Sequence, residues 1–279
     1  MSGPAISFCL CLSIALASAG AEDPVVFNDG MLDARIAAST GKLPHCLSRF
    51  LDYPPGNGKS GFRPNPDFWL KGIDLTCASP WNDSYGRVRA GTAISRRHIV
   101  CAKHFPLAVG TRIAFVGETG EVSHYSVTAT KAHETCDIMV GLLDYELTPD
   151  IHPAKVLPAD FEKWIPVGTS WPLLTLNQDE KAFLSHMRCL RSNVAGHIRW
   201  LNKKLPKQQS ISSFGGGLTG GDSGNPAFLL YRGRPILLFC VLSGGAGDGP
   251  KIHEFRGDVQ RMMDDLCPGY VLENFDFRK

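Results

Sequence analysis

The sequence has no excess of charge of either sign. Its 279 residues include 29 Lys and Arg against 27 Asp and Glu, which leaves a net charge of +2. Proteins whose main partner is nucleic acid or an anionic membrane usually carry a basic surplus. We therefore expect no nucleic-acid partner and no stable membrane insertion.

Metal-binding cysteine motifs and internal repeats are also missing. No CxxC pair and no Cys/His group has the spacing of a zinc site, so we expect no metal and no cofactor. The 29 glycines and 19 prolines follow no period, which excludes collagen-like and low-complexity chains. An apolar fraction of 43% is enough to bury one large core or two small ones. The composition predicts a globular protein, all-β or mixed, with an appendage.

The first 21 residues contain no Asp, Glu, Lys or Arg. An apolar run from about Ile6 to Ala17 leads into Ala-Ser-Ala at residues 17–19 and Ala-Gly-Ala at residues 19–21. Both are small-residue patterns that a signal peptidase cleaves, and the run is too short to cross a bilayer comfortably. The alternative is a buried N-terminal helix. We predict a signal peptide over residues 1–21 and a mature protein that is secreted or periplasmic.

Export would place the cysteines in an oxidising compartment, where disulfide bonds form. Seven cysteines remain after cleavage, and this odd number leaves at least one thiol unpaired in a monomer. Two pairings are candidates: Cys46 with Cys77, and Cys189 with Cys267. Three further cysteines lie in apolar, strand-like runs where a small buried side chain is expected: Cys101, Cys136 and Cys240.

Turn and loop signals dominate residues 22–85. The segments 54–58 (Pro-Pro-Gly-Asn-Gly) and 63–66 (Arg-Pro-Asn-Pro) are typical of turns, and residues 32–38 are the one candidate for a short helix. We predict an N-terminal extension that wraps over the main domain, which comprises residues 86–279.

From residue 90 onward, short runs of β-branched or alternating apolar residues are separated by turns. Such a series predicts a β-sandwich or barrel. The runs are 92–94, 98–100, 112–116, 124–130, 138–143, 173–176, 227–231 and 235–242. Near the C-terminus, Val259, Met262, Met263 and Leu266 recur at helical spacing, which predicts an amphipathic helix from about Phe255 to Leu266.

The sequence Gly-Asp-Ser-Gly-Asn-Pro at residues 221–226 lies in a glycine-rich stretch just before an apolar strand. A serine on such a tight turn is free to meet a substrate carbonyl. The backbone N–H groups of Gly221 and Ser223 can converge on the oxygen that becomes negative, and donors of this kind lower a barrier by about 3–4 kcal/mol each. The same composition is also that of an ordinary Gly/Ser turn.

A serine hydroxyl is a poor nucleophile without a base. His104 follows the apolar run 99–102, and a histidine at the end of a buried strand is held on a rigid element. Asp137 opens the apolar run 138–143, and a carboxylate in that position can fix the tautomer of an imidazole and stabilise its charge. The alternatives are a core histidine with satisfied hydrogen bonds and a strand-edge acid that faces solvent.

The chain order His104, Asp137, Ser223, with the segment around each residue, resembles that of the chymotrypsin-like serine proteases. Four segments carry the resemblance: residues 91–104 resemble the strand pair that ends in "TAAHC", 137–140 the "DIAL" segment, 221–226 the "GDSGGP" motif, and 241–245 the strand that closes the specificity pocket. The similarity spans about residues 86–266. It implies an all-β fold of two six-stranded antiparallel β-barrels with the active site in the cleft between them, plus a C-terminal α-helix.

The resemblance also implies roles for individual residues. His104 would act as general base and then as general acid, Asp137 would orient it, and Ser223 would attack the peptide carbonyl to form an acyl-enzyme. The N–H groups of Gly221 and Ser223 would form the oxyanion hole, and Ser243 would hydrogen-bond Asp137. The substrate-binding residues implied in the same way are Gly217, Leu218, Ser243, Gly244 and Gly245.

The specificity pocket implied by the resemblance is uncharged. Gly217 stands where trypsin-like members carry an acid, so we expect cleavage after an apolar or aromatic residue rather than after Lys or Arg. Asp248 would reverse this preference if it projected into the pocket from the following loop.

The chain departs from the family pattern in three ways. Phe105 replaces the cysteine that usually follows the catalytic histidine. Asn225 replaces a glycine of the "GDSGGP" motif, at a position that follows the catalytic turn. No "IVGG"-like activation site precedes His104. In activated members the aspartate before the serine pairs with a freed N-terminus, so Asp222 lacks that partner. An unpaired buried carboxylate is costly. We therefore expect an Arg or backbone donors to hold Asp222, and no propeptide cleavage beyond the signal.

The sequence thus predicts a secreted serine endopeptidase with a polypeptide substrate. A catalytically silent homologue that binds a protein partner is the alternative. An esterase would use the same acyl-transfer chemistry, but the residue two positions after Ser223 is Asn225, so the Gly-x-Ser-x-Gly motif of many esterases is not present there. No pattern in the chain specifies an oligomeric state.

Overall fold

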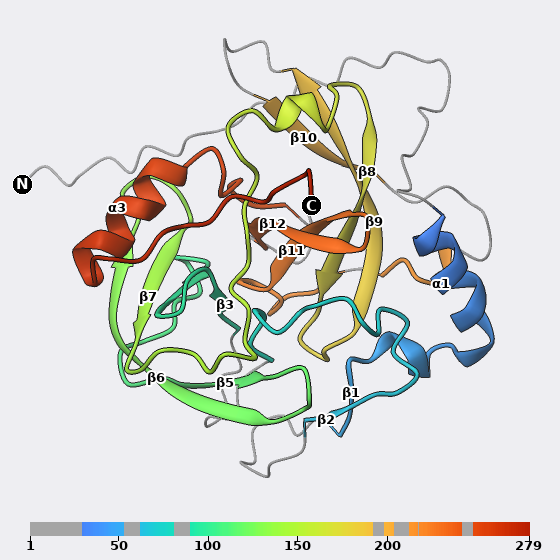
Figure 1. Ribbon diagram of the computed structural model, residues 1–279, viewed down its shortest axis with the longest axis horizontal. Helices are drawn as coiled ribbons and strands as arrows, with labels where there is room; N and C mark the ends of the chain where they lie inside the picture. Colours follow the sequence, from blue (N-terminus) through green and yellow to red (C-terminus); the bar gives the residue numbers. More distant parts are fainter. Residues whose placement is uncertain are drawn as a thin grey trace, which may run out of the picture.

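The computed structural model describes residues 30–52, 62–80, 90–191, 198–203, 212–216, 218–241 and 248–279. These residues form a mostly β protein with few helices and three antiparallel sheets (Figure 1). Two sheets have five strands each and the third has two. The closed six-stranded barrels expected from the resemblance are therefore not reproduced strand for strand in the described residues.

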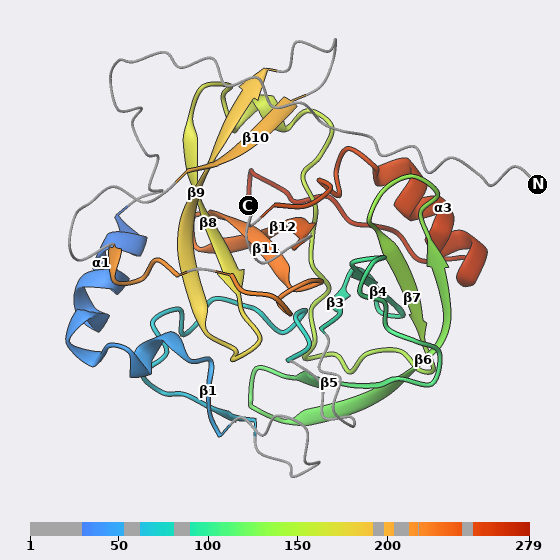
Figure 2. The ribbon, with the colours of Figure 1, turned by 180° about the vertical axis from the view of Figure 1, so that it is seen from behind.

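The first sheet curls into a half-barrel (Figures 1 and 2) and has the strand order β3-β4-β7-β6-β5. Its strands are β3 (Thr92–Ala93), β4 (His98–Cys101), β5 (Arg112–Val116), β6 (Val122–Ala132) and β7 (Met139–Leu143). All four residues of β4 are buried, as a continuous apolar run predicts for a strand covered on both faces. β6 lies at the surface and exposes polar residues along its length.

The second sheet has the order β10-β9-β8-β11-β12. Its strands are β8 (Ser170–Leu176), β9 (Ala182–Arg191), β10 (Ile198–Lys203), β11 (Pro226–Tyr231) and β12 (Arg234–Cys240). Every residue of β8 and β11 is buried, which confirms the strands expected from the apolar runs 173–176 and 227–231.

The N-terminal part of the described chain packs against both large sheets. It contains α1 (Met31–Ser39), the 3-10 turns η1 (Thr40–Lys42) and η2 (His45–Leu47), and the two-stranded sheet of β1 (Phe50–Asp52) and β2 (Arg63–Pro64). The buried Trp69 donates its indole N–H to the carbonyl of Ala182 in the second sheet. Cys77 accepts a backbone hydrogen bond from Ala93 in the first sheet. This segment therefore joins the two sheets.

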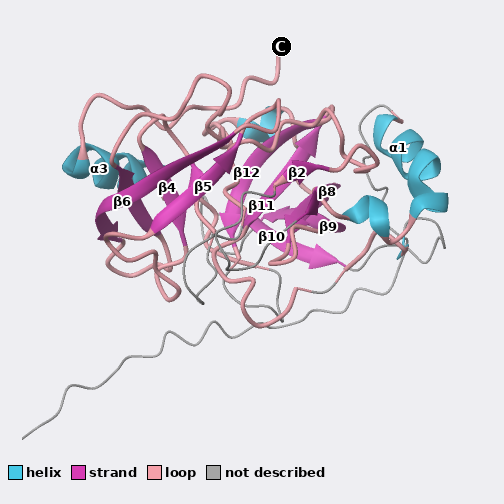
Figure 3. Ribbon diagram, turned by 90° about the horizontal axis from the view of Figure 1, so that it is seen from below, coloured by secondary structure: helices cyan, strands magenta, loops and turns pink. Residues whose placement is uncertain are grey.

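The expected C-terminal helix is confirmed as α3 (Arg256–Leu266). Its buried residues Val259, Met262 and Met263 face β6 and β7, as their spacing requires. α3 and α1 lie at opposite ends of the molecule, with the sheets between them (Figure 3). After α3 the chain returns to the middle of the molecule, where Val156 forms parallel bridges with Leu237 and Asn274. A further short helix is η3 (Phe161–Lys163).

All seven cysteines of the described residues are free thiols. The two candidate disulfides, Cys46 with Cys77 and Cys189 with Cys267, are therefore not formed in this structure. Burial raises the pKa of Cys77 and of Cys189 to about 12, so both thiols are protonated at neutral pH. No helix of the described residues is long and apolar enough to span a membrane.

Candidate active site

The register of the first sheet brings His104 and Asp137 together. β4 pairs antiparallel with β7, and Cys101 lies opposite Met139. His104 comes three residues after Cys101, while Asp137 comes two residues before Met139. In an antiparallel pair the chain leaving one strand meets the chain entering the other. The two side chains therefore lie at the same end of the β4–β7 pair, although 33 residues separate them in sequence.

Both oxygens of the Asp137 carboxylate bind His104. Oδ1 accepts the backbone N–H of His104 at 2.7 Å, and Oδ2 lies 2.7 Å from the ring Nδ1. A carboxylate only accepts hydrogen bonds, so Nδ1 of the neutral ring carries the proton and Nε2 is left with its lone pair. The Asp137 side chain is 15% exposed and that of His104 is 43% exposed. The geometry therefore holds an imidazole in one tautomer and leaves the ring accessible.

The loop before Asp137 is held from two sides. Lys103 donates from Nζ to the carbonyls of His133 (2.7 Å) and Glu134 (3.1 Å). The Nδ1 atom of His133 accepts the backbone N–H groups of Thr135 (3.2 Å) and Cys136 (3.0 Å). These bonds fix the chain immediately before Asp137, so the carboxylate is positioned by its own loop as well as by its contact with His104.

Ser223 lies on a turn that two glycines with positive φ make possible. Gly221 has φ +107° and Gly224 has φ +88°, a backbone conformation that strains residues with a Cβ atom. The backbone N–H of Gly224 donates to the carbonyl of Val241, and that of Val241 donates to the carbonyl of Asn225. The turn is thereby fastened to the residue that follows β12. Ser223 itself is half-buried.

Asp222 is held by backbone donors, as expected from the sequence. Its carboxylate is fully buried and accepts the backbone N–H of Gln178 at 2.8 Å and that of Thr219 at 2.6 Å. The Thr219 hydroxyl approaches to 3.4 Å. Because Gln178 belongs to the turn between β8 and β9, the buried carboxylate also ties that turn to the segment that carries Ser223.

The serine turn packs against the end of β4. A Cβ atom added at Gly224 would lie 3.6 Å from the backbone nitrogen of Ala102 and 3.7 Å from the carbonyl oxygen of Ala90. Gly224 is one residue from Ser223, and Ala102 is two residues from His104. The turn from the second sheet and the histidine from the first sheet are therefore in adjacent backbone segments.

Cys240 lies at the same junction. Cys240 ends β12 and is buried. Burial raises its pKa well above the ordinary value, and the neighbouring Cys101 and the charge of Asp137 contribute to this. The end of β12, the end of β4 and Asp137 thus lie close together where the two large sheets meet.

The substrate-binding residues implied by the sequence are only partly described. Leu218 is partly buried and packs against the apolar core of the second sheet. Four lie outside the described residues: Gly217, Ser243, Gly244 and Gly245. Asp248 is paired with the ammonium group of Lys251 and also accepts the N–H of Gly249 at 2.7 Å. Its charge is therefore neutralised next to the segment 242–247.

Three residues that support this site were not predicted from the sequence: Lys103, Gln178 and Thr219. Lys103 has the sequence signal of being next to His104, but the carbonyls that it binds belong to a loop 30 residues away. Gln178 and Thr219 reach Asp222 through backbone N–H groups, which every residue type except proline possesses. Such contacts leave no signature in residue identity.

The chain matches no known family model and no curated protein. An imidazole of fixed tautomer with a free lone pair can accept a proton from a hydroxyl group that comes within hydrogen-bond distance. The described residues also contain one group with suitable ligand atoms for a metal ion, Asp74, Glu118 and His152, and none of these three takes part in the contacts of His104.

Proposed function

We propose that this protein is a serine endopeptidase of the chymotrypsin-like kind, which hydrolyses peptide bonds through an acyl-enzyme on Ser223. One observation carries the proposal. It is the pair of hydrogen bonds, each 2.7 Å, that fixes His104 on Asp137 in a segment adjacent to the turn that bears Ser223. One carboxylate oxygen holds the ring Nδ1 and the other holds the backbone N–H of the same residue, so the imidazole is fixed both in tautomer and in position.

In the proposed mechanism, Nε2 of His104 takes the proton of the Ser223 hydroxyl while Oγ attacks the carbonyl carbon of the substrate. The imidazolium that forms is stabilised by Asp137 through the Nδ1–H bond and then gives its proton to the leaving amine. Water repeats the sequence on the acyl-enzyme and regenerates Ser223. By the general behaviour of such triads, loss of the carboxylate costs about four orders of magnitude in turnover.

The oxyanion in this proposal is bound by the backbone N–H groups of Gly221 and Ser223. The positive φ values of Gly221 and Gly224 support it, because they give the turn the tight curvature that such a pair of donors needs. The pairing of Asp248 with Lys251 supports an uncharged specificity pocket. We therefore propose cleavage after apolar or aromatic residues.

The proposal extends to architecture and processing. The two five-stranded antiparallel sheets, with His104 and Asp137 at the edge of one and Ser223 beside the other, support the two-barrel architecture with its active site between the barrels. Residues 1–21 would be removed on export, which leaves residues 22–85 as an extension of a domain that begins near residue 86. The backbone donors around Asp222 support an enzyme that needs no further cleavage.

Labelling with a fluorophosphonate tests the proposed function directly, because the probe reacts with activated serines. The experiment uses residues 22–279 and the variants Ser223→Ala, His104→Ala and Asp137→Asn. Ser213→Ala, which removes an exposed serine just before the glycine-rich stretch, is the matched control. We expect labelling of the wild type and of the control, and no labelling of Ser223→Ala or His104→Ala. A panel of peptides and esters with Phe, Leu, Arg or Lys at the cleaved position then measures specificity.

The outcomes separate the three functions considered. Turnover of peptides with Phe or Leu supports the endopeptidase, whereas turnover of esters alone indicates an esterase. No labelling of a folded wild-type sample contradicts an active enzyme. A repeat after limited proteolysis then decides between a latent zymogen, which gains labelling, and a silent binding homologue, which does not.

A further inference from the structure

Three side chains with metal-ligating atoms meet on the surface from distant parts of the chain. Asp74 belongs to the N-terminal part that joins the two sheets, Glu118 to the turn between β5 and β6, and His152 to the segment that connects the first sheet to the second. One ligand atom from each lies within 4.8 Å of the other two. The His152 Nδ1 atom is 2.8 Å from Asp74 Oδ2 and 3.7 Å from Glu118 Oε1.

Asp74 and His152 are oriented by a shared partner. Oδ1 of Asp74 accepts the backbone N–H of Thr76 at 3.0 Å and its hydroxyl at 2.7 Å. The same hydroxyl oxygen accepts the backbone N–H of His152 at 2.9 Å. Thr76 therefore turns the free oxygen of Asp74 toward the imidazole, an arrangement of the kind that outer partners provide around metal ligands.

We propose that Asp74, Glu118 and His152 bind a divalent metal ion of the zinc type. In a tetrahedral zinc site with bonds of about 2.0–2.1 Å, ligand atoms lie about 3.3 Å apart, and the measured 2.8 and 3.7 Å bracket this separation. An imidazole nitrogen with two carboxylates suits Zn²⁺, whereas Ca²⁺ and Mg²⁺ prefer oxygen ligands. A fourth position is left for water or an incoming ligand.

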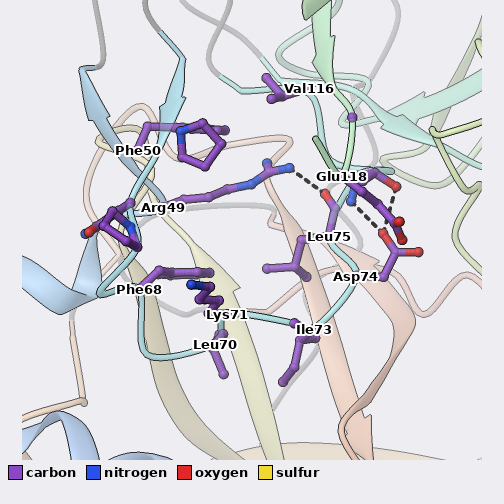
Figure 4. A pocket seen from close by; sticks show the side chains of 16 residues that line it. Arg49, Phe50, Phe68, Leu70, Lys71, Ile73, Asp74, Leu75, Val116 and Glu118 are labelled. Atoms are coloured by element: carbon purple, nitrogen blue, oxygen red, sulfur yellow. Dashed lines mark hydrogen bonds between the residues drawn. The ribbon is translucent and has the colours of Figure 1, made fainter. Parts of the chain in front are cut away.

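The surroundings of the cluster suit a cation and an additional ligand. Asp74 and Glu118 lie side by side at one end of a pocket of about 580 Å³ (Figure 4), which is lined by apolar residues of the N-terminal part and by Val116 of β5, together with the polar or charged Arg49, Asn65, Lys71 and Thr76. The carboxylate of Asp150 adds negative charge, since it packs against Gly117, the neighbour of Glu118. The three ligand side chains are between 37% and 61% exposed, so an ion can enter without unfolding.

Without a metal, the Nδ1–H of His152 donates a hydrogen bond to Asp74 Oδ2 and faces Glu118, and a bound ion would take the place of that proton. Such interactions contribute about 0–1 kcal/mol and are screened by salt. A bound ion instead connects the N-terminal part, the first sheet and the connecting segment, and binding to the native state alone raises the melting temperature by mass action. Metal binding also requires a deprotonated imidazole, so the affinity for zinc falls on acidification.

Calorimetric titration with zinc chloride tests the site on tag-free protein of residues 22–279 after treatment with a chelator. We expect one ion per chain. His152→Asn, Asp74→Asn and Glu118→Gln should each weaken binding about tenfold or more without a change in the melting temperature of the metal-free protein beyond about 1–2 °C. His45→Asn is the matched control, because His45 is also exposed and lies 3.9 Å from a single carboxylate, that of Asp67.

Cobalt(II) in place of zinc provides a second measurement, since free thiols also bind zinc. The proposed ligands give a visible spectrum of low-symmetry Co²⁺ without the near-ultraviolet band of cobalt–thiolate bonds. Three results would overturn the site: unchanged zinc affinity in folded His152→Asn, a thiolate band in the cobalt spectrum, or no binding of zinc to folded wild-type protein. Fluorophosphonate labelling is measured in parallel, so that failure of the metal site is distinguished from failure of the proposed enzyme.

Discussion

The buried carboxylate of Asp222 accepts hydrogen bonds from two backbone N–H groups in different segments. One oxygen faces Gln178 and the other faces Thr219. Hydrogen bonds to an ionised acceptor are stronger than neutral ones, and this pair compensates for the loss of water around the charge. The residue before the candidate nucleophile is thus a structural link between the β8–β9 turn and the serine turn.

Replacing Asp222 with Asn should destabilise the fold by about 2–4 kcal/mol. The amide has one acceptor oxygen, so its NH₂ group would face a backbone N–H of Gln178 or Thr219. Urea unfolding measures this loss. Asp179→Asn is the control, because Asp179 lies in the same β8–β9 turn with its side chain 61% exposed. We expect the control to change the free energy of unfolding by less than about 0.5 kcal/mol; equal losses in both variants would contradict the role of Asp222.

At the scale of elements, the loop of residues 133–137 couples α3 to the candidate site. His133 lies in this loop, and its ring packs edge-on against Phe255 at 5.3 Å. Its Nε2 atom lies 3.4 Å from the carboxylate of Asp258 in α3, while Nδ1 accepts two backbone N–H groups of the loop. One imidazole therefore accepts hydrogen bonds from two backbone N–H groups of the loop and also connects the loop to the helix.

His133→Ala should slow fluorophosphonate labelling about tenfold, because the loop that positions Asp137 loses two hydrogen bonds to one acceptor atom and small displacements of catalytic groups are costly. The free energy of unfolding should fall by about 1–2 kcal/mol. Asp258→Asn keeps the ring and its bonds to the loop and should label nearly as fast as the wild type. A slow Asp258→Asn variant beside a fast His133→Ala variant would mean that the helix contact, and not the loop, positions Asp137.

The elements that could be predicted from the sequence are those whose burial is regular. The apolar run 138–143 predicts β7, because a continuous run is typical of a strand buried on both faces. The helical spacing of Val259, Met262 and Met263 predicts α3, because it places the three residues on one side of the helix. β9 and β10 were not predicted. β9 carries Ser185, His186 and Arg188 among its apolar residues, and His186 is buried, so its pattern is interrupted at a position that faces the interior.

The candidate site divides in the same way. The short segments around His104, Asp137 and Ser223 are each contiguous in sequence, so the three residues could be proposed from the sequence. The hydrogen bonds from Lys103 to the loop of residues 133–137 depend on the register of β4 with β7. The donors around Asp222 depend on the position of the β8–β9 turn. In each of these contacts a side chain meets a backbone N–H or carbonyl group, which nearly every residue type possesses, so residue identity does not show which backbone group is the partner.

At the scale of the whole molecule, the N-terminal part acts as a connection between the two large sheets. The guanidinium of Arg49 is buried and donates to the carbonyls of Leu75 (2.9 Å) and Ala78 (3.0 Å). The backbone N–H of Arg49 donates to Glu180 at the second sheet, and Ala78 bridges to Thr92 at the first. Burial lowers the pKa of Arg49, with the charge of Glu180 opposing this change.

The stability of the whole fold should fall between pH 6.5 and pH 4. His98 is fully buried on β4, with Nδ1 2.8 Å from the Ser95 hydroxyl and its ring against Tyr270. Burial lowers the pKa of His98 from 6.5 to about 4, with the Met263 carbonyl opposing the change. Burial also lowers the pKa of His253 to about 4.

The direction of the change follows from proton uptake. Below pH 6.5 the unfolded chain binds protons that the native chain does not bind until about pH 4. The contribution of the neutral, buried histidine to the free energy of unfolding is therefore fully present above pH 6.5 and is lost on acidification toward pH 4. The shift in the pKa of His98 corresponds to a contribution of about 3 kcal/mol to the free energy of unfolding. Urea unfolding at a series of pH values measures the slope, which His98→Gln should reduce and His124→Gln, a change at an exposed position of β6, should not. A slope that is equal in all three proteins would show that the native state already accommodates a charged His98.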